Sequence, residues 1–122
     1  MLAGELIKQK LGPIFPKALF ADMAPEGCKE KFYCVYQYIS TVPTSTLDAG
    51  YLDEDTCRIQ VDVYGNGETL GAVMKKVKEV TDALAKNNTD LPVLFLGKRT
   101  IPEPETRHKR VSLDFSITET VT

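Results

Sequence analysis

The sequence predicts an α+β two-layer sandwich, in which two helices cover one face of a four-stranded, mainly antiparallel sheet. Residues 56–64 and 107–118 alternate apolar and polar side chains with a period of two, which is typical of half-buried strands. Residues 68–86 instead repeat apolar residues with a helical period. The predicted order is helix, strand, strand, helix, strand, strand, and pairing one apolar stripe per helix with one apolar sheet face gives two layers.

Two amphipathic helices are expected. The first covers residues 2–11, where Leu2, Leu6, Ile7 and Leu11 form one stripe, and Gly12-Pro13 ends it. The second covers residues 68–86, with Asn66 as its N-cap and with Asn87-Asn88 supplying the left-handed residue that ends it. Its apolar positions follow the i, i+3, i+4, i+7 pattern and are Leu70, Val73, Met74, Val77, Val80 and Leu84.

Four strands are expected. Residues 32–39 (FYCVYQYI) are rich in aromatic and β-branched side chains. Residues 56–64 turn Cys57, Ile59, Val61 and Val63 to one face. Residues 92–99 form a short apolar strand that opens with a proline, which favours a sheet edge or a strand start. Residues 107–118 turn Val111, Leu113, Phe115 and Ile117 inward.

The remaining segments are interpreted as connections within a single domain, residues 1–122. Residues 13–30 are irregular, and residues 40–55 (STVPTSTLDAGYLDED) lack periodicity, which predicts a long flexible loop. The stretch TIPEPET (100–106) is expected to form a stiff hairpin loop because it contains two prolines.

Composition excludes several classes of protein. A net charge of -2 and a pI of about 5.4 do not favour binding to nucleic acid or to an anionic membrane. Three widely spaced cysteines and one histidine do not make a zinc site, and they predict a reducing compartment. The first twelve residues carry charges among the apolar ones, so we expect neither a signal peptide nor a membrane span, and a chain that stays in the cytoplasm.

No catalytic, cofactor-binding or metal-binding residue is predicted. His108, the only histidine, lies in the basic run RHKR and is expected to be a solvated surface residue. The turn Gly65-Asn66-Gly67-Glu68 lacks a phosphate-binding pattern, and Glu68 would repel an anion. Asp53, Glu54 and Asp55 are expected to form a solvated acidic loop.

Charge is segregated along the chain. The acidic loop holds Asp48, Asp53, Glu54 and Asp55, and the later basic hairpin holds Lys98, Arg99, Arg107, Lys109 and Arg110. Two loops of opposite charge suit a head-to-tail contact between copies of the chain, which closes rings, although two independently solvated loops would explain the same pattern. These nine residues are the predicted subunit or tube interface.

A second candidate surface is the polar face of the sheet. It is expected to display residues of both charges, namely Arg58, Gln60, Asp62, Arg110, Ser112 and Asp114. Cross-strand ion pairs on a solvated face explain this composition, and so does a sheet that lines a ring lumen or packs on a neighbour. Arg58, Gln60, Asp62 and Asp114 are therefore the predicted lumen or sheet-face residues.

The strand, turn and helix RIQVDVYGNGETLGAVMKKVKEVTDAL (58–84) resemble the tail terminator, or tail completion, proteins of long-tailed bacteriophages. HKRVSLDFSI (108–117) is similar to the closing strand of that family, and FYCVYQYIS (32–40) is similar to its first strand. The first twenty residues and TIPEPET match no family pattern. Length and element order agree over nearly the whole chain.

The resemblance implies a structural protein of the virion tail or neck, assembled in the host cytoplasm and acting without catalysis. It implies a ring, of six copies, that caps the tail tube, stops its growth and offers the surface that joins the head connector, with DNA passing through the lumen without sequence-specific binding. The alternatives are another neck adaptor with the same fold and, from a different class, a small ligand-binding domain or enzyme.

Overall fold

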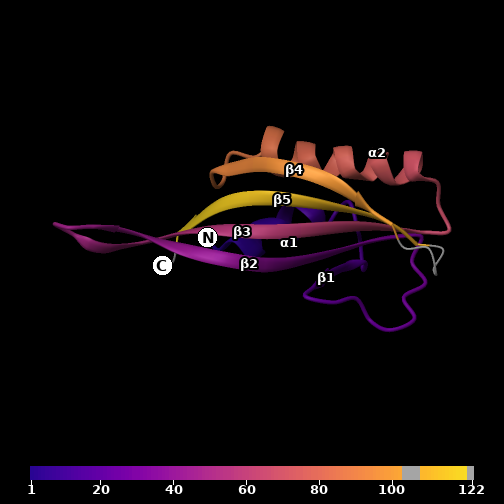
Figure 1. The fold of residues 1–122 in the computed structure, drawn as a ribbon, viewed down its shortest axis with the longest axis horizontal. Helices are drawn as coiled ribbons and strands as arrows, with labels where there is room; N and C mark the ends of the chain where they lie inside the picture. Colours follow the sequence, from indigo (N-terminus) through magenta and orange to yellow (C-terminus); the bar gives the residue numbers. More distant parts are fainter. Residues whose placement is uncertain (103–107, 121–122) are drawn as a thin grey trace.

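The computed structural model describes residues 1–102 and 108–120, and its elements alternate much as the sequence predicts. Figure 1 shows long strands that run side by side along the longest axis of the molecule. The elements in chain order are α1 (Ala3–Leu11), β1 (Leu19–Ala21), β2 (Phe32–Thr46), β3 (Gly50–Asn66), α2 (Leu70–Thr81), the π-helical turn η1 (Asp82–Lys86), β4 (Val93–Ile101) and β5 (His108–Thr120).

The sheet has five strands and is mixed, so the prediction of four strands was too low. The strand order is β1-β2-β3-β5-β4. β1 pairs with β2 in parallel, whereas the β2–β3, β3–β5 and β5–β4 pairs are antiparallel. The additional strand, β1, has only three residues and lies in the segment 13–30 that was expected to be irregular. Three residues are too few to display a period of two, which is why the pattern did not reveal this strand.

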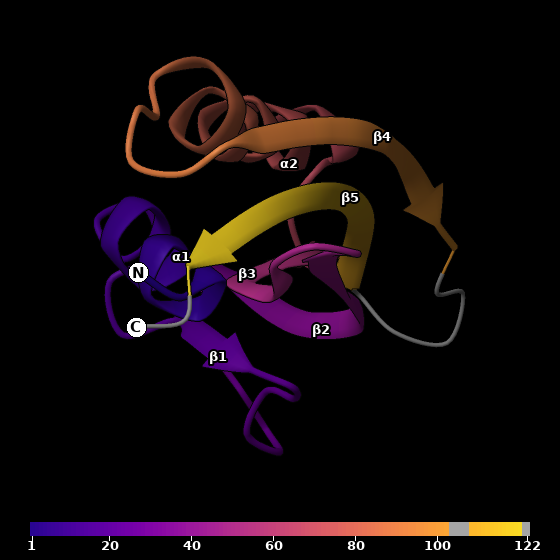
Figure 2. The ribbon, with the colours of Figure 1, turned by 90° about the vertical axis from the view of Figure 1, so that its left-hand side faces the viewer.

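Both helices lie on the same side of the sheet, as expected for a two-layer α+β fold (Figure 2). They supply buried residues to one hydrophobic core, Leu6 and Leu11 from α1 and Val73 and Val77 from α2. Among the apolar positions predicted for the second helix, Leu70 is the exception, because it begins α2 and remains exposed.

The core side of the sheet is built from the residues that the alternation placed there. Val61 lies opposite Tyr36 on β2 and Leu113 on β5, and all three side chains are buried. Cys34 and Cys57 are fully buried free thiols, in agreement with their expected role as small apolar residues. Burial raises the pKa of the Cys57 thiol to about 11, so this group stays neutral at ordinary pH.

The start of α2 differs in detail from the prediction. The N-cap is Thr69, whose hydroxyl accepts a hydrogen bond from the backbone N–H of Ala72 at 3.2 Å, rather than Asn66. Asn66 is the last residue of β3 and still pairs with His108. The expected helix of residues 68–86 is thus a shorter α-helix that continues into η1. At its end, the Asn88 side chain donates hydrogen bonds to two backbone carbonyls. The expected left-handed residue was wrong, because neither Asn87 nor Asn88 has a positive φ.

A buried carboxylate joins three elements near the chain ends. Glu119 of β5 is only 6% exposed and accepts a hydrogen bond from the backbone N–H of Ala3 at 2.8 Å. The hydroxyl of Tyr38 on β2 donates to the same carboxylate at 3.2 Å. Since Leu2 offers no side-chain cap, Glu119 satisfies one of the unpaired N–H groups at the start of α1.

The segment 40–55 is not a flexible loop, which corrects the prediction. β2 continues to Thr46 and β3 begins at Gly50, so the two strands form one long hairpin. Figure 1 shows the tip of this hairpin projecting beyond the other elements. We call residues 43–53 the arm: within the described chain its strands pair only with each other, because β5 pairing begins at Glu54 and β1 pairing is confined to residues 34–36.

Candidate assembly surfaces

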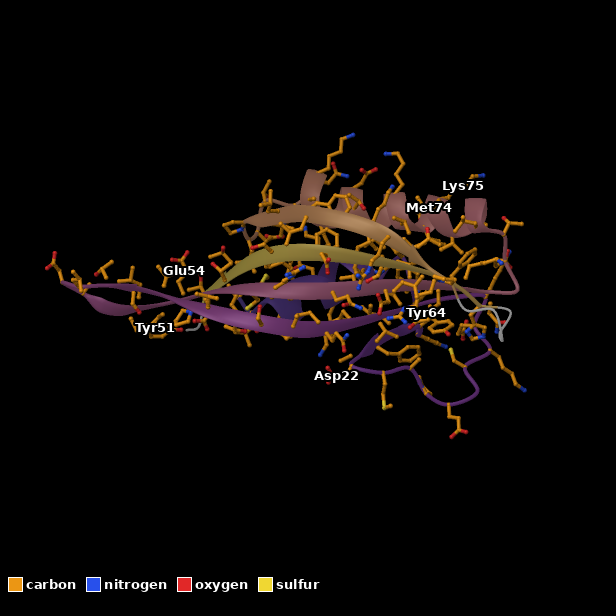
Figure 3. All side chains as sticks on the ribbon, viewed as in Figure 1. Asp22, Tyr51, Glu54, Tyr64, Met74 and Lys75 are labelled. Atoms are coloured by element: carbon orange, nitrogen blue, oxygen red, sulfur yellow. The ribbon has the colours of Figure 1, made fainter. Side chains whose placement is uncertain are left out.

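The arm carries exposed apolar side chains without a core behind them. Leu47, at the tip, is fully exposed, and Tyr51 and Leu52 are 45% and 43% exposed. Figure 3 shows side chains standing out on both sides of this part of the ribbon, with no helix packed against it. An isolated two-stranded hairpin is at best marginally stable in water. The arm would therefore gain stability from contact with another molecule.

The four predicted acidic residues lie on the arm or at its base. Asp48 is exposed in the turn, and Asp53 is exposed with a left-handed backbone at φ 57°. Glu54 and Asp55 are half-buried where β3 enters the sheet, and Asp55 accepts a hydrogen bond from the Tyr51 hydroxyl at 2.9 Å. The acidic segment is thus a defined ribbon rather than the flexible loop that the sequence predicted.

The predicted basic residues divide into three groups. Lys98, Arg99 and Lys109 are exposed on β4 and at the start of β5. Arg110 is half-buried, and its guanidinium donates to the Asp62 carboxylate at 2.9 Å. Arg107 and most of the TIPEPET segment lie outside the described residues. Arg110 is consequently a structural ion-pair partner as well as a member of the predicted interface.

The polar face of the sheet is less open than expected. Asp62 is only 4% exposed and Ser112 only 3%, so neither is displayed to solvent. Asp62 accepts hydrogen bonds from Gln60 on its own strand, in addition to the Arg110 contact. Farther along the sheet, Arg58 lies 3.5 Å from Asp114 and remains exposed. Both ion pairs join diagonal positions of β3 and β5, which agrees with the cross-strand pairing considered from sequence.

An aromatic cluster at one end of this face was not predicted. The rings of Tyr33 and Tyr64 stack with centroids 4.6 Å apart. The Tyr33 hydroxyl lies 2.6 Å from Nδ1 of His108, and the guanidinium of Arg110 lies over the Tyr64 ring. His108 is thus a packed, hydrogen-bonded side chain, which corrects its expected place as a solvated residue. The signal available in the sequence was the pair of aromatic residues on neighbouring strands, Tyr33 and Tyr64.

This cluster lines a cleft of about 440 Å³ together with residues 22–24 and the Asp62–Arg110 pair. Four of the polar side chains in the cleft are paired with each other, Tyr33 with His108 and Asp62 with Arg110. No group of three or more side chains able to hold a metal ion occurs within residues 1–102 and 108–120. No helix in the same residues is long and apolar enough to cross a membrane.

A comparison with protein families decides the identity. Residues 9–120 match the family described as tail completion protein gp17. The chain belongs to this family. It is accordingly a phage tail completion protein and a structural component of the virion, as the resemblance of its strands to tail terminators predicted.

A comparison with solved structures agrees at the level of the fold. A chain from the virion of a native gene transfer agent particle superposes with a TM-score of 0.65, at 15% sequence identity. The match covers 88% of this tail completion protein and 82% of that chain. No curated protein sequence matches it.

Proposed function

We propose that this tail completion protein, acting as a single domain over residues 1–122, forms a ring, of six copies, on the end of the tail tube. The ring stops tube growth and offers the surface that joins the head connector. Its partners are further copies of itself, the tail tube protein and the connector protein, and DNA passes through its lumen without base-specific contacts. It performs these tasks by binding, without catalysis.

The observation that carries this proposal is the arm. A virion component whose family role is tail completion must bind other subunits, and residues 43–53 form a ribbon with exposed apolar residues and no internal core. Burial of such side chains contributes about 25 cal/mol per Å² of apolar area removed from water. The arm therefore gains stability when a second molecule covers it.

The position of the charges supports a head-to-tail arrangement. Asp48 and Asp53 lie at the arm end of the molecule, whereas Lys109 pairs with Gly65 near the opposite end of β3. At about 3.3 Å per residue, Asp53 and Lys109 are roughly 40 Å apart, so they cannot meet within one chain. Between two copies, however, the acidic end of one can face the basic end of the next. This is a head-to-tail contact, which generates a ring when the rotation between copies closes.

The polar sheet face is our proposed lumen lining. Of its residues, Arg58 is positive, Gln60 is neutral, and Asp62 and Asp114 are negative. Within each of the Arg58–Asp114 and Asp62–Arg110 pairs the two charges offset each other. A wall of paired charges presents no strong field to the DNA backbone, which would let DNA pass without being held.

The test uses purified protein alone, with purified tail tubes and with purified connectors. Negative-stain microscopy is expected to show rings, or caps on tube ends, and light scattering is expected to give the mass of a closed ring. Binding of the protein to tubes in preference to connectors would indicate a terminator rather than another neck adaptor. A strict monomer at high concentration that also leaves tube ends bare would refute the ring.

The interface assignment is tested by charge reversal at exposed positions. Lys98, Arg99 and Lys109 changed together to glutamate should prevent assembly and leave the far-ultraviolet circular dichroism spectrum unchanged, because these side chains are exposed. Arg110 is kept as arginine, since Asp62 depends on it. If the triple variant formed rings of normal stability, the assignment of these residues to the interface would be wrong.

A further inference from the structure

β4 is an edge strand that carries exposed apolar side chains. It ends the strand order β1-β2-β3-β5-β4, so one of its edges has no strand partner in the described part of the chain. Leu94 and Leu96 on this strand are 63% and 48% exposed, and Lys98 and Arg99 follow after Gly97. An exposed strand edge of this kind is a template for pairing with another chain. Its composition is two leucines followed by two cations.

The arm has the complementary composition. Leu47 and Leu52 are exposed beside Asp48 and Asp53, so the arm presents two leucines with two carboxylates. Its outer strand edges are also unpaired among the described residues, because β1 pairs only with residues 34–36 and β5 reaches only Glu54. The arm and β4 thus offer free backbone edges, apolar side chains and opposite charges to each other.

We propose that, in the ring inferred above, the arm of one copy lies along the β4 edge of the next copy and extends its sheet. Backbone hydrogen bonds of the added strand join the two copies, as in other strand-addition interfaces. The leucines of the arm cover Leu94 and Leu96, and its carboxylates face Lys98 and Arg99. This inference rests on the proposed ring and identifies the contact that closes it.

The occupant of β4 is a second copy of this chain for two reasons. The arm begins where β3 leaves β5 and points away from the sheet along its long axis, so it does not fold back onto β4 of its own chain (Figures 1 and 3). In addition, the carboxylates of the arm and the cations of β4 belong to the same chain, so every copy supplies both halves of the contact. A head-to-tail contact repeated in this way needs no other protein to close.

The contact is tested by site-directed cross-linking. Leu47→Cys and Leu96→Cys are combined in a Cys28→Ser background, where the two remaining cysteines, Cys34 and Cys57, are fully buried. On copper-catalysed oxidation, with and without purified tail tubes, the double variant should give a ladder of linked subunits on a non-reducing gel. A mixture of the two single variants should stop at dimers, because each copy then carries only one reactive end.

A control pair replaces Leu96→Cys by Lys75→Cys on α2, an exposed position outside the proposed contact (Figure 3). This pair should give no ladder. Rings or caps that form normally but never link residue 47 to residue 96 would overturn the arm–β4 contact and leave the proposed function intact. A chain that never assembles, alone or on tubes, would overturn both.

Charge reversal adds a second readout. Asp48→Lys with Asp53→Lys should weaken assembly at least about tenfold, because like charges then face each other across the contact. Adding Lys98→Glu and Arg99→Glu to the same chain should restore assembly. A quadruple variant that assembles no better than the double variant would contradict this pairing.

Discussion

The two halves of the β2–β3 hairpin share a backbone pairing but differ in what surrounds them. In the inner half, Val61 is flanked by Tyr36 and Leu113, and its side chain is fully buried beneath the helices. In the arm, residues 43–53 pair with each other alone, and their apolar side chains are exposed. Both halves thus have backbone hydrogen bonds between their strands, but only the inner half contributes side chains to the hydrophobic core. The difference teaches that the inner half holds the fold and the arm is available for partners.

The largest expected difference is in amide hydrogen exchange of the monomer. The amides of Val61 and Leu113 should exchange only on global unfolding, whereas those of Ser45 and Tyr51 should exchange by local opening of the arm. For a protein of ordinary stability this corresponds to protection at least about 10³-fold higher in the inner half. Amide hydrogen exchange followed by NMR measures this ratio of protection factors. Equal protection of both halves in a proven monomer would refute the distinction.

On the inner half, Arg110→Glu should cost about 3–5 kcal/mol of unfolding free energy, because it places a second carboxylate beside the buried Asp62. The matched control is Lys109→Glu, an exposed neighbour, which should change stability by less than about 0.5 kcal/mol. Urea unfolding followed by circular dichroism measures both. If the two variants were equally stable, the Asp62–Arg110 pair would not be structural.

Leucine and isoleucine truncations separate folding from assembly. Ile59→Ala should cost about 2–5 kcal/mol, because the side chain is fully buried and its removal leaves a cavity. Leu47→Ala should leave stability within about 0.5 kcal/mol of the parent, since that side chain is fully exposed, yet it should weaken ring formation. Thermal unfolding and light scattering measure the two effects. A strongly destabilised Leu47→Ala monomer would mean that the arm packs on its own chain.

The smallest effects are expected from two glycines of β3. A Cβ at Gly65 would lie 2.5 Å from a methyl group of Val73, so Gly65→Ala should cost about 1–3 kcal/mol through overpacking. Gly50, at the arm end, has a left-handed φ of 68° and open space around it. Gly50→Ala strains the turn, but the arm can open locally, so global stability should fall by less than about 0.5 kcal/mol. The reverse order of the two costs would count against an independently opening arm.

The charge pattern of the sequence selected candidate interface residues, and their role in an interface stays a prediction. Asp48, Asp53, Lys98, Arg99 and Lys109 are among them, and all five are exposed in the structure. Cross-strand ion pairs on this face were considered from sequence, but only the register of β3 and β5 shows that Arg110 bonds to Asp62 on the diagonal. The aromatic cluster of Tyr33, Tyr64 and His108 was missed for the same reason: its members meet only once β2, β3 and β5 are in register.

The amino-acid sequence alone determined the two helices, the alternating inner strands and the core side chains, because an amphipathic element must bury its apolar stripe whatever its partner. Only the tertiary structure decided the arm, the short strand β1 and the burial of Asp62. Residues 40–55 contain a few apolar residues, such as Val42, Leu47 and Leu52, that do not alternate with the polar ones. The segment therefore carries no period of two, and its strand conformation comes from pairing β2 with β3. β1 exists because residues 19–21 lie against β2, and Asp62 is buried because Arg110 and Gln60 reach it.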